Sequence, residues 1–482
     1  MPENLRSKVN AGLRWTALGQ ASGSLINVIA TLVLLRLVAP EWFGLVAMVG
    51  VFSGFISNFA GLGIAESLVQ RQQPKAQHQH TLFWWNVLAG LVGAILLLVT
   101  APLLRWIYQS TIPNLVFWML SAVVFFSVAG QIPLSVLQRD MAFRSLWKAR
   151  FGAQAVAAVA AVATAWYGAF LTAILLRPLL QSALTMLSAL WILRWQPRVE
   201  LSLAVLRSHL NFGKDLTLNN LLGYGVRAVD DLAIGRWAGA EPLGYYSKAY
   251  SILLFPVRRV SSIVVQVFFP TFSALKQAGQ PIGKAYTQIC EAISLFTFPL
   301  MIWVAVEAAS IVPFVLGPLW VPAVPIVQVL AILSSLQSVG TLSGMVFQST
   351  GAVRLQLRLG LLLKPFMVAA IVATAWWSKD AWAVAVAYSA ASIIALVPEQ
   401  YYAAKSIGLG FGAVGRALAP AGGSTIIAVI PLLLLPGTSD LLDLALRTLV
   451  FGAIYGGSLY LLFPRAWKQQ IGLARRFFNT KS

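Results

Sequence analysis

The feature that most constrains this chain is a long series of apolar segments, each of about 20 to 25 residues, separated by short polar or Gly- and Pro-containing stretches. One such segment, folded as a helix, crosses the hydrocarbon core of a bilayer and hydrogen-bonds all of its own backbone groups. The sequence therefore predicts an all-α polytopic membrane protein. We place fourteen transmembrane helices, with the approximate bounds 11–35, 43–68, 82–104, 114–137, 151–167, 170–193, 211–235, 244–274, 286–305, 322–348, 359–377, 382–404, 417–436 and 444–463.

The composition agrees with this prediction. Hydrophobic residues make up 59% of the 482 and charged residues only 10%, whereas soluble proteins carry about 25% charged residues. The formal net charge of +20 would suggest nucleic-acid binding in a soluble protein. Here 24 of the 35 Lys and Arg residues fall in alternate connections on the side of both termini, five, among them Arg447, fall on the other side, and six fall within spans. This asymmetry follows the positive-inside rule, so we predict cytoplasmic termini and no nucleic-acid partner.

Several function classes lack the residues that they need. The single cysteine, Cys290, excludes an internal disulfide and a thiolate metal cluster, and the three histidines, His78, His80 and His209, are assigned to connections. The run GLGFGAVGR at 408–416 has closely spaced glycines, but it follows a membrane helix and lacks the Lys-Ser/Thr of a P-loop. The connections are too short for a catalytic domain. We therefore expect no metal, no cofactor and no enzymatic activity.

A repeat divides the chain. Three residues recur at a constant offset of 200: Arg36, Glu41 and Gly44 in LLRLVAPEWFGL correspond to Arg236, Glu241 and Gly244 in AIGRWAGAEPLGY. Both copies end one span and open the next on the same side of the membrane. They predict two pseudo-symmetric six-helix lobes, the architecture of a transporter that rocks one lobe against the other, followed by two C-terminal helices. The predicted domains are an N-terminal lobe at 1–200, a C-terminal lobe at 201–410, and two extra helices with a basic cytoplasmic tail at 411–482.

Two of the spans carry charges that a bilayer disfavours. Spans 211–235 and 244–274 contain five ionisable residues: Arg227, Asp230, Asp231, Arg258 and Arg259. A charge at the centre of a bilayer helix costs roughly 2.5 to 3.5 kcal/mol, so a partner or a function must compensate. Arg227 can form a local ion cluster with the aspartates three and four residues later, or it can line a lumen, and both interpretations stay open. No acid lies three or four residues from Arg258 or Arg259, which favours a lumen for at least one of them.

The repeat offset matches Arg227 with Asn27 and Arg258 with Asn58. A lumen between the lobes would then be cationic on one wall and neutral on the other. It would attract a phosphate or pyrophosphate, whose oxygens accept bidentate hydrogen bonds from arginine. Arg177, which precedes Pro178, is interpreted as snorkelling to the outer interface. Four acids are candidates for coupling to an ion gradient: Asp230, Asp231, Glu66 and Glu399.

Longer motifs resemble a known family. The run DDLAIGRWAGAEPLGYYSKAYSILLFP with FFPTFSAL, and the runs RLVAPEWFGLVAM, GLGIAESLVQR, HTLFWWN, QIPLSVLQRDMAFRSL and LGPLWVPAVPIVQVLAI, are similar to the polysaccharide transport family, within the multidrug/oligosaccharidyl-lipid/polysaccharide (MOP) flippase superfamily. The likeness is greatest to its WzxC-like branch and covers about residues 5–365. It implies a bacterial inner-membrane flippase that moves an undecaprenyl-pyrophosphate-linked oligosaccharide by alternating access, with a cationic cavity and ion-gradient coupling.

We therefore predict a flippase for lipopolysaccharide or exopolysaccharide biosynthesis. In this hypothesis Arg258, with Arg259 or Arg227, holds the pyrophosphate, and polar residues contact the sugar: Asn27, Asn58, Asn219, Asn220 and Tyr224. The expected partners are the lipid-linked oligosaccharide and membrane lipids, and polysaccharide assembly proteins are candidates. One alternative is an ion-coupled multidrug exporter of the same superfamily, which the excess of intramembrane arginine disfavours. The other is a membrane polymerase or glycosyltransferase, which would need a large catalytic loop.

Overall fold

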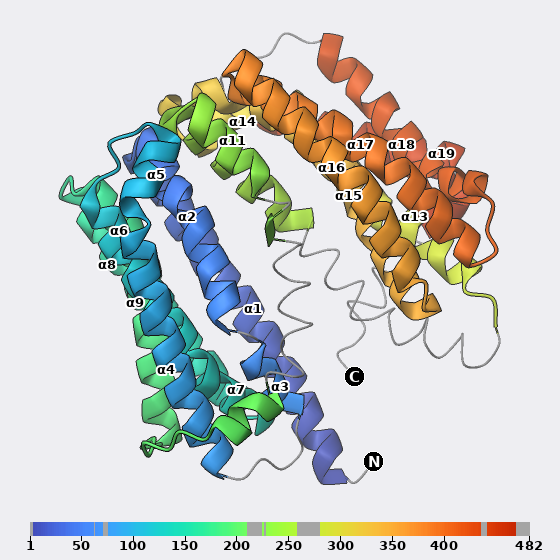
Figure 1. The fold of residues 1–482 in the computed structure, drawn as a ribbon. Helices are drawn as coiled ribbons and strands as arrows, with labels where there is room; N and C mark the ends of the chain where they lie inside the picture. The colour runs from blue at the N-terminus through green and yellow to red at the C-terminus, as the bar shows by residue number, and fades with distance from the viewer. Residues whose placement is uncertain are drawn as a thin grey trace. The chain divides into compact units, whose positions relative to one another are not determined.

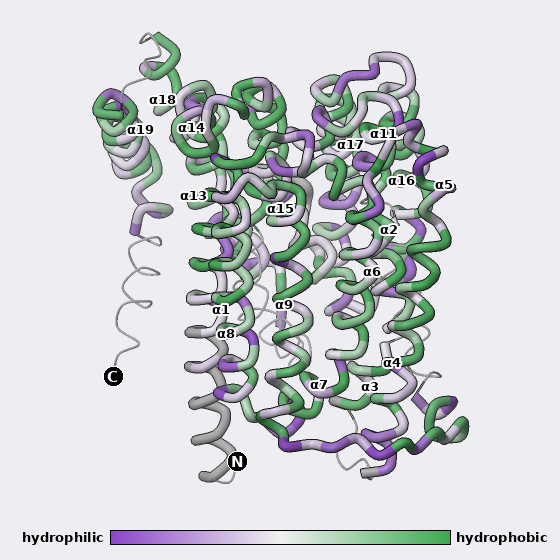
Figure 2. The backbone as a smooth tube through the Cα atoms, turned by 90° about the vertical axis from the view of Figure 1, so that its left-hand side faces the viewer, coloured by the Kyte–Doolittle hydropathy of each residue, from purple (hydrophilic) through white to green (hydrophobic). Residues whose placement is uncertain are grey.

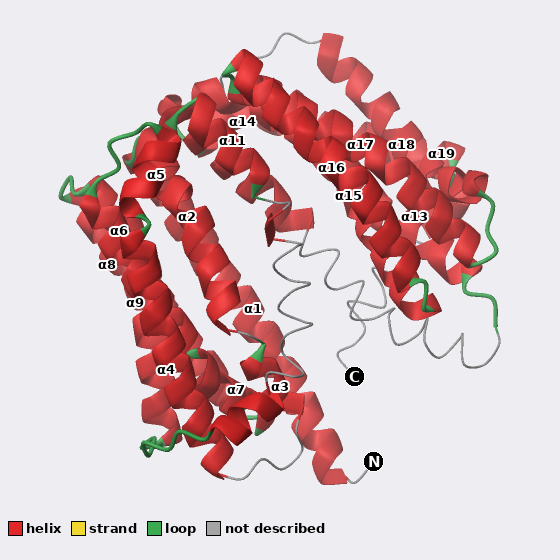
Figure 3. Ribbon diagram, in the orientation of Figure 1, coloured by secondary structure: helices red, strands yellow, loops and turns green. Residues whose placement is uncertain are grey.

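The structure is a computed structural model, and it describes residues 3–61, 63–70, 76–209, 224–225, 228–257, 280–434 and 441–468. Every regular element in these ranges is helical, and none of them contains a strand (Figure 3). The prediction of an all-α protein is confirmed. The chain divides into two compact units, Met1–Gly244 and Tyr245–Ser482, and each is described by itself.

The N-terminal unit is a bundle of long helices with short ones at their ends (Figure 1). α8 packs against α1 and α9, and α6 packs against α2, α4 and α9. The helices are α1 Glu3–Leu37, α2 Pro40–Gly61, α3 Ile64–Gln70, α4 Ala76–Val99, α5 Ala101–Tyr108, α6 Asn114–Ala129, α7 Gln131–Arg139, α8 Phe143–Trp166, α9 Phe170–Leu193 and α11 Val229–Trp237.

The alanines of α8 explain why these helices lie so close together. All the buried residues of α8 are alanines: Ala149, Ala153, Ala157, Ala158, Ala161 and Ala165. A spacing of about four residues places them in one stripe along the helix. In a membrane, where lipid is as apolar as leucine, small side chains allow helix backbones to approach and gain dispersion contacts. The stripe therefore specifies where the neighbouring helices pack.

The C-terminal unit has the same construction. α13 packs against α15 and α18, α17 packs against α15 and α16, and α19 covers α18. Tyr286 and Cys290 of α13 and Phe347 of α15 belong to a buried apolar cluster of this unit. The helices are α13 Gly283–Val306, α14 Ala308–Val315, the 3₁₀ helix η1 Pro318–Ala323, α15 Val324–Thr350, α16 Val353–Ser378, α17 Ala381–Ser406, α18 Phe411–Leu434 and α19 Leu441–Leu462.

Twelve helices in the described ranges are long and apolar enough to cross a membrane. Each corresponds to one predicted span, and the two remaining predictions, 211–235 and 244–274, lie partly outside the described residues. Figure 2 shows that α4 and α13 are apolar along much of their length. Apolar side chains are also on the outside of α4, where the exposed ones are Leu88, Leu91, Val92, Ile95, Leu96, Leu98 and Val99. Such surfaces suit lipid contact, as expected of a multi-pass membrane protein.

The start of the fifth span differs from the prediction. The sequence suggested a start at residue 151, whereas α8 begins at Phe143, so Lys148 and Arg150 lie inside the helix and not in a connection. The charged residues lower the average hydropathy of this segment without ending the helix, since the long stem of a Lys or Arg can lie along an apolar surface.

The boundary of the N-terminal unit also lies beyond the predicted lobe boundary at residue 200. The compact unit extends to Gly244 because α11 packs against α2 and α5. The compact unit is defined by which helices contact one another, whereas the predicted lobe is defined by the sequence repeat. The two boundaries therefore need not coincide. The domains based on the repeat, 1–200, 201–410 and 411–482, therefore stay a prediction.

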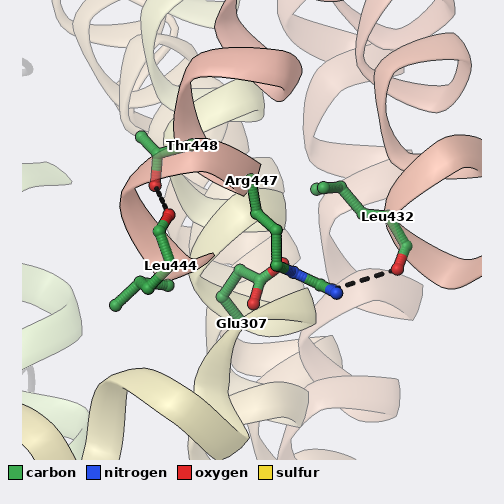
Figure 4. Close-up of polar contacts among 5 residues, drawn as sticks. All are labelled: Glu307, Leu432, Leu444, Arg447 and Thr448. Carbon is green, nitrogen blue, oxygen red and sulfur yellow. Dashed lines mark hydrogen bonds and ion pairs between the residues drawn. The ribbon is translucent and has the colours of Figure 1, made fainter. Parts of the chain in front are cut away.

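A buried ion pair joins the last helix to the rest of the C-terminal unit (Figure 4). The Nε of Arg447 in α19 donates to Oε1 of Glu307 at 2.8 Å, and its Nη2 donates to the Leu432 carbonyl of α18 at 3.0 Å. The two side chains are only 6% and 2% exposed. Arg447, which the sequence assigns to the outer side, lies near the start of α19, and Glu307 neutralises it there.

Candidate functional site

Part of the predicted cavity lies outside the residues that the structure describes. This holds for Arg227, Arg258, Arg259, Asn219 and Asn220, and for the side chain of Glu66. The other candidates, Asn27, Asn58, Tyr224, Asp230, Asp231 and Glu399, are described.

The two copies of the repeat motif meet at their glycines, inside the N-terminal unit. A Cβ added at Gly44 would lie 1.7 Å from the carbonyl oxygen of Ala240, and one added at Gly244 would lie 2.0 Å from that of Pro40. Pro40 and Ala240 are themselves related by the 200-residue offset. The contact is therefore reciprocal, as a local two-fold relation between the copies requires, which supports the predicted repeat. The repeat-related acids Glu41 and Glu241 line a pocket of about 410 Å³ beside it.

Two tyrosines donate hydrogen bonds to backbone carbonyls in consecutive turns of α2. The hydroxyl of Tyr108 donates to the Met48 carbonyl and that of Tyr224 to the Val51 carbonyl, both at 3.0 Å. Burial, followed by the charge of Asp231 and by Tyr224, raises the pKa of Tyr108 far above its usual value. Tyr108 is therefore protonated at physiological pH and keeps donating to α2. The Tyr224 proton is likewise directed at α2.

Glycines make room for both tyrosine rings. A Cβ on Gly54 would lie 2.2 Å from the Tyr224 hydroxyl oxygen, and one on Gly235 would lie 2.7 Å from the Tyr108 ring. Gly54 also accepts a hydrogen bond through its carbonyl, from the exposed side-chain amide of Asn58, at 2.8 Å. The face of α2 around Gly54 thus gathers two of the predicted sugar-contacting residues, Asn58 and Tyr224.

Asn27 has a cationic partner. One guanidinium nitrogen of Arg177 in α9 donates to both the side-chain and backbone oxygens of Asn27, and another donates to the Thr31 hydroxyl at 2.9 Å. The interpretation of Arg177 as snorkelling to the outer interface is wrong, because α1 holds its head group. Asn27, which belongs to the predicted neutral wall, thus has a cation beside it, and the wall itself stays a prediction.

Replacing Arg177 with Gln should loosen α1 from α9. Hydrogen bonds from a charged donor contribute about 1.5–3 kcal/mol, and the shorter glutamine cannot make all three. We expect a loss of stability of about that size in detergent unfolding of the purified protein. In a double-mutant cycle, Asn27→Ala combined with Arg177→Gln should cost little more than Arg177→Gln alone. Fully additive losses would contradict the contact.

The acidic candidates differ in their surroundings. Asp230 is buried in the first turn of α11, and Asp231 is half-buried beside it. Glu399 of α17 is half-buried within a span, and its carboxylate interacts electrostatically with the positive charge of Lys364 in α16. In the described ranges no group of three His, Cys, Asp or Glu residues is placed to hold a metal ion.

Two groups of polar residues were not predicted. The histidines converge: His209 is fully buried, its Nδ1 lies 2.6 Å from the Ser67 hydroxyl, and its Nε2 lies 3.2 Å from Nδ1 of His78. The second group, which includes Arg150 and Gln154, lines a pocket among α6, α8 and α9. The second group could have been recognised in the sequence, because Arg150 and Gln154 are polar residues four positions apart in an otherwise apolar helix.

A known protein family matches this chain. The family model described as "Polysaccharide biosynthesis protein" matches residues 33–325, more than half of the chain. The chain belongs to this family.

Known proteins agree with the family assignment. This polysaccharide biosynthesis protein is 27% identical over 352 residues to "Teichuronic acid biosynthesis protein TuaB" of Bacillus subtilis (strain 168), and the match covers 72% of each chain. It is 24% identical over 373 residues to "Lipopolysaccharide biosynthesis protein WzxC" of Escherichia coli (strain K12), covering 77% of this chain and 75% of the relative. The resemblance to the WzxC-like branch is confirmed.

The fold of the polysaccharide biosynthesis protein has a solved counterpart. It is similar to that of "Lipid II flippase MurJ, inward closed conformation", with a TM-score of 0.68 at 11% identity, over 93% of this chain and 98% of that one. At this identity the likeness concerns the fold alone. It agrees with the prediction of an all-α polytopic membrane protein.

Proposed function

We propose that this protein is a flippase of the bacterial inner membrane, which moves undecaprenyl-pyrophosphate-linked oligosaccharide repeat units to the periplasmic leaflet for lipopolysaccharide or exopolysaccharide biosynthesis. One observation carries the proposal: a sequence of the polysaccharide biosynthesis family adopts, over nearly its whole length, the fold of a lipid II flippase. A lipid-linked saccharide is the cargo that both resemblances have in common. Both termini lie in the cytoplasm in this proposal, as the distribution of Lys and Arg indicates.

Alternating access supplies the mechanism. The lobes at 1–200 and 201–410 rock about the repeat motifs, and a central site opens to each side in turn. Arg258, with Arg259 or Arg227, neutralises the pyrophosphate, and amides such as Asn27 and Asn58 hydrogen-bond the glycan. Asp230, Asp231, Glu66 and Glu399 are the candidates for binding H⁺ or Na⁺. We assign the chain transport and no catalytic step.

Replacing Arg258 with Ala tests the site. In a strain whose own copy is deleted, the wild-type chain should restore surface polysaccharide, and Arg258→Ala should abolish export while the protein still accumulates in the membrane. Lys284→Ala, which removes an exposed cation from the first turn of α13, is the matched control and should export normally. Normal export from Arg258→Ala would remove this residue from the mechanism, and normal polysaccharide in the deletion strain would refute the function.

A further inference from the structure

A polar pocket lies within the N-terminal unit, among α6, α8 and α9. Its volume is about 550 Å³, within the range of about 300–1,000 Å³ that small-ligand sites occupy. Half of its lining is polar: Ser127, Arg150, Gln154, Gln181, Ser182 and Thr185. The remainder is apolar and includes the aromatic ring of Phe126.

The pocket lies about halfway along two helices that are long and apolar enough to cross a membrane. Gln154 is eleven residues after Phe143, the first residue of α8, and Gln181 is eleven residues after Phe170, the first residue of α9. At 1.5 Å per residue both lie about 17 Å along helices that are about 36 Å long. α8 and α9 run in opposite directions, connected by a short turn, so their midpoints coincide. Polar residues at this depth are costly unless they serve a function.

The polar side chains of the pocket have few partners. The side chains of Arg150, Gln154, Gln181 and Thr185 make no hydrogen bond or ion pair with any residue that the structure describes. The Gln154 side chain extends towards Gly23 of α1, where a Cβ would lie 2.8 Å from its Oε1. Arg150 is exposed and the other three are half-buried, so their donors and acceptors are open to a polar ligand.

The charge of the lining residues indicates which class of ligand the pocket would bind. Arg150 is the one charged residue among the described residues that line it, and no Asp or Glu is among them. A cation without an acid favours an anion, and a guanidinium donates two parallel hydrogen bonds to a carboxylate or a phosphate. The amides of Gln154 and Gln181 and the Thr185 hydroxyl both donate and accept, as ligand hydroxyls do, and Phe126 offers an apolar surface to a sugar ring.

From this arrangement we propose that the N-terminal unit contains a binding site for an acidic sugar residue. Arg150 pairs with the acid group, and Gln154, Gln181 and Thr185 hydrogen-bond the ring hydroxyls. The inference rests on the proposed function in that such a sugar would belong to the transported glycan. The site uses other residues than the predicted pyrophosphate site, which uses Arg258.

Binding to the purified full-length protein in detergent tests the site. The probes are D-glucuronate, D-glucose and inorganic phosphate, and binding is followed by saturation-transfer NMR and titration. Glucuronate should bind at least tenfold more tightly than glucose, since the charged group adds one strong interaction. Arg150→Gln should remove this preference. Lys148→Gln, which removes an exposed cation of the same helix, should keep it.

The outcomes separate the alternatives. Equal binding of glucose and glucuronate, or a preference that survives in Arg150→Gln, would overturn the site. So would phosphate binding through Arg150 without glucuronate binding, because the pocket would then hold an anion and not a sugar. Arg150 makes no contact that the fold needs, so Arg150→Gln should melt like the wild type. The measurement uses neither lipid-linked cargo nor a gradient, and it can therefore succeed even if the chain moves no lipid-linked oligosaccharide.

Discussion

Replacing Glu307 with Gln is expected to destabilise the C-terminal unit by about 3–5 kcal/mol, the loss seen when one partner of a buried ion pair is removed. Glutamine has the same shape, so packing is retained, but Arg447 keeps its charge with its carboxylate partner gone. The Leu432 carbonyl, which also accepts a hydrogen bond from Arg447, is a weaker acceptor than a carboxylate. Because this pair joins α19 to the end of α13, we expect the last helix to separate first. The measurement is unfolding of the purified protein in a denaturing detergent.

Two comparisons make this result specific. Asp140→Asn breaks an exposed ion pair, Arg139 with Asp140, whose carboxylate side chain is 49% exposed, and should change stability by less than about 1 kcal/mol. Replacing both Glu307 and Arg447 with Met should recover much of the loss, since an apolar pair needs no neutralising partner. Unfolding of Glu307→Gln at the wild-type detergent concentration would show that Arg447 does not depend on this carboxylate.

Replacing Gly44 with Ala is expected to destabilise the protein, although Gly→Ala inside a helix normally stabilises by about 1 kcal/mol. The added Cβ would lie 1.7 Å from the Ala240 carbonyl oxygen, which is backbone and cannot rotate away. The two copies of the repeat motif would have to separate, and overpacking of this kind costs about 1–3 kcal/mol or more. In the proposed mechanism the same change should also reduce export, because the lobes rock about these motifs.

The glycines of α2 provide a graded series for this prediction. Gly50 has no heavy atom within 4 Å of an added Cβ, so Gly50→Ala should be neutral or slightly stabilising. At Gly54 the obstacle is the tip of the Tyr224 side chain, which can move at the cost of its hydrogen bond to Val51. Stability should therefore fall in the order Gly50→Ala, Gly54→Ala, Gly44→Ala. Equal melting temperatures for Gly44→Ala and Gly50→Ala would contradict the close crossing.

The helices and the repeat could be predicted because both leave regular patterns in the chain. Apolar runs of membrane-crossing length gave twelve spans that the structure contains. The repeat could be recognised because the two motifs approach each other so closely that only glycine fits at positions 44 and 244. Both copies therefore have a glycine at this position. The packing of helices that are far apart in the sequence leaves no such regular pattern in the chain.

The partners of the buried cations could not be predicted from the sequence. Arg447 and Glu307 are 140 residues apart, and Arg177 meets Asn27 at a separation of 150, so local spacing contains nothing that links them. Arg150 was assigned to a connection because hydropathy averages do not distinguish a cation inside a helix from one just before it. Arg150 and Arg177 thus lie within membrane-crossing helices of the N-terminal unit, whereas the predicted cavity cations belong to the C-terminal lobe.

The flippase proposal is tested most directly by reconstituting the purified chain into vesicles with an undecaprenyl-pyrophosphate-linked oligosaccharide confined to the inner leaflet. A membrane-impermeant glycosidase, added outside, then measures how fast the glycan reaches the outer leaflet, with H⁺ or Na⁺ gradients of either direction and without a gradient. We predict that the glycan becomes accessible far faster than in protein-free vesicles under at least one of these conditions. Accessibility at the protein-free rate under all of them, with folded protein in the membrane, would contradict the proposal.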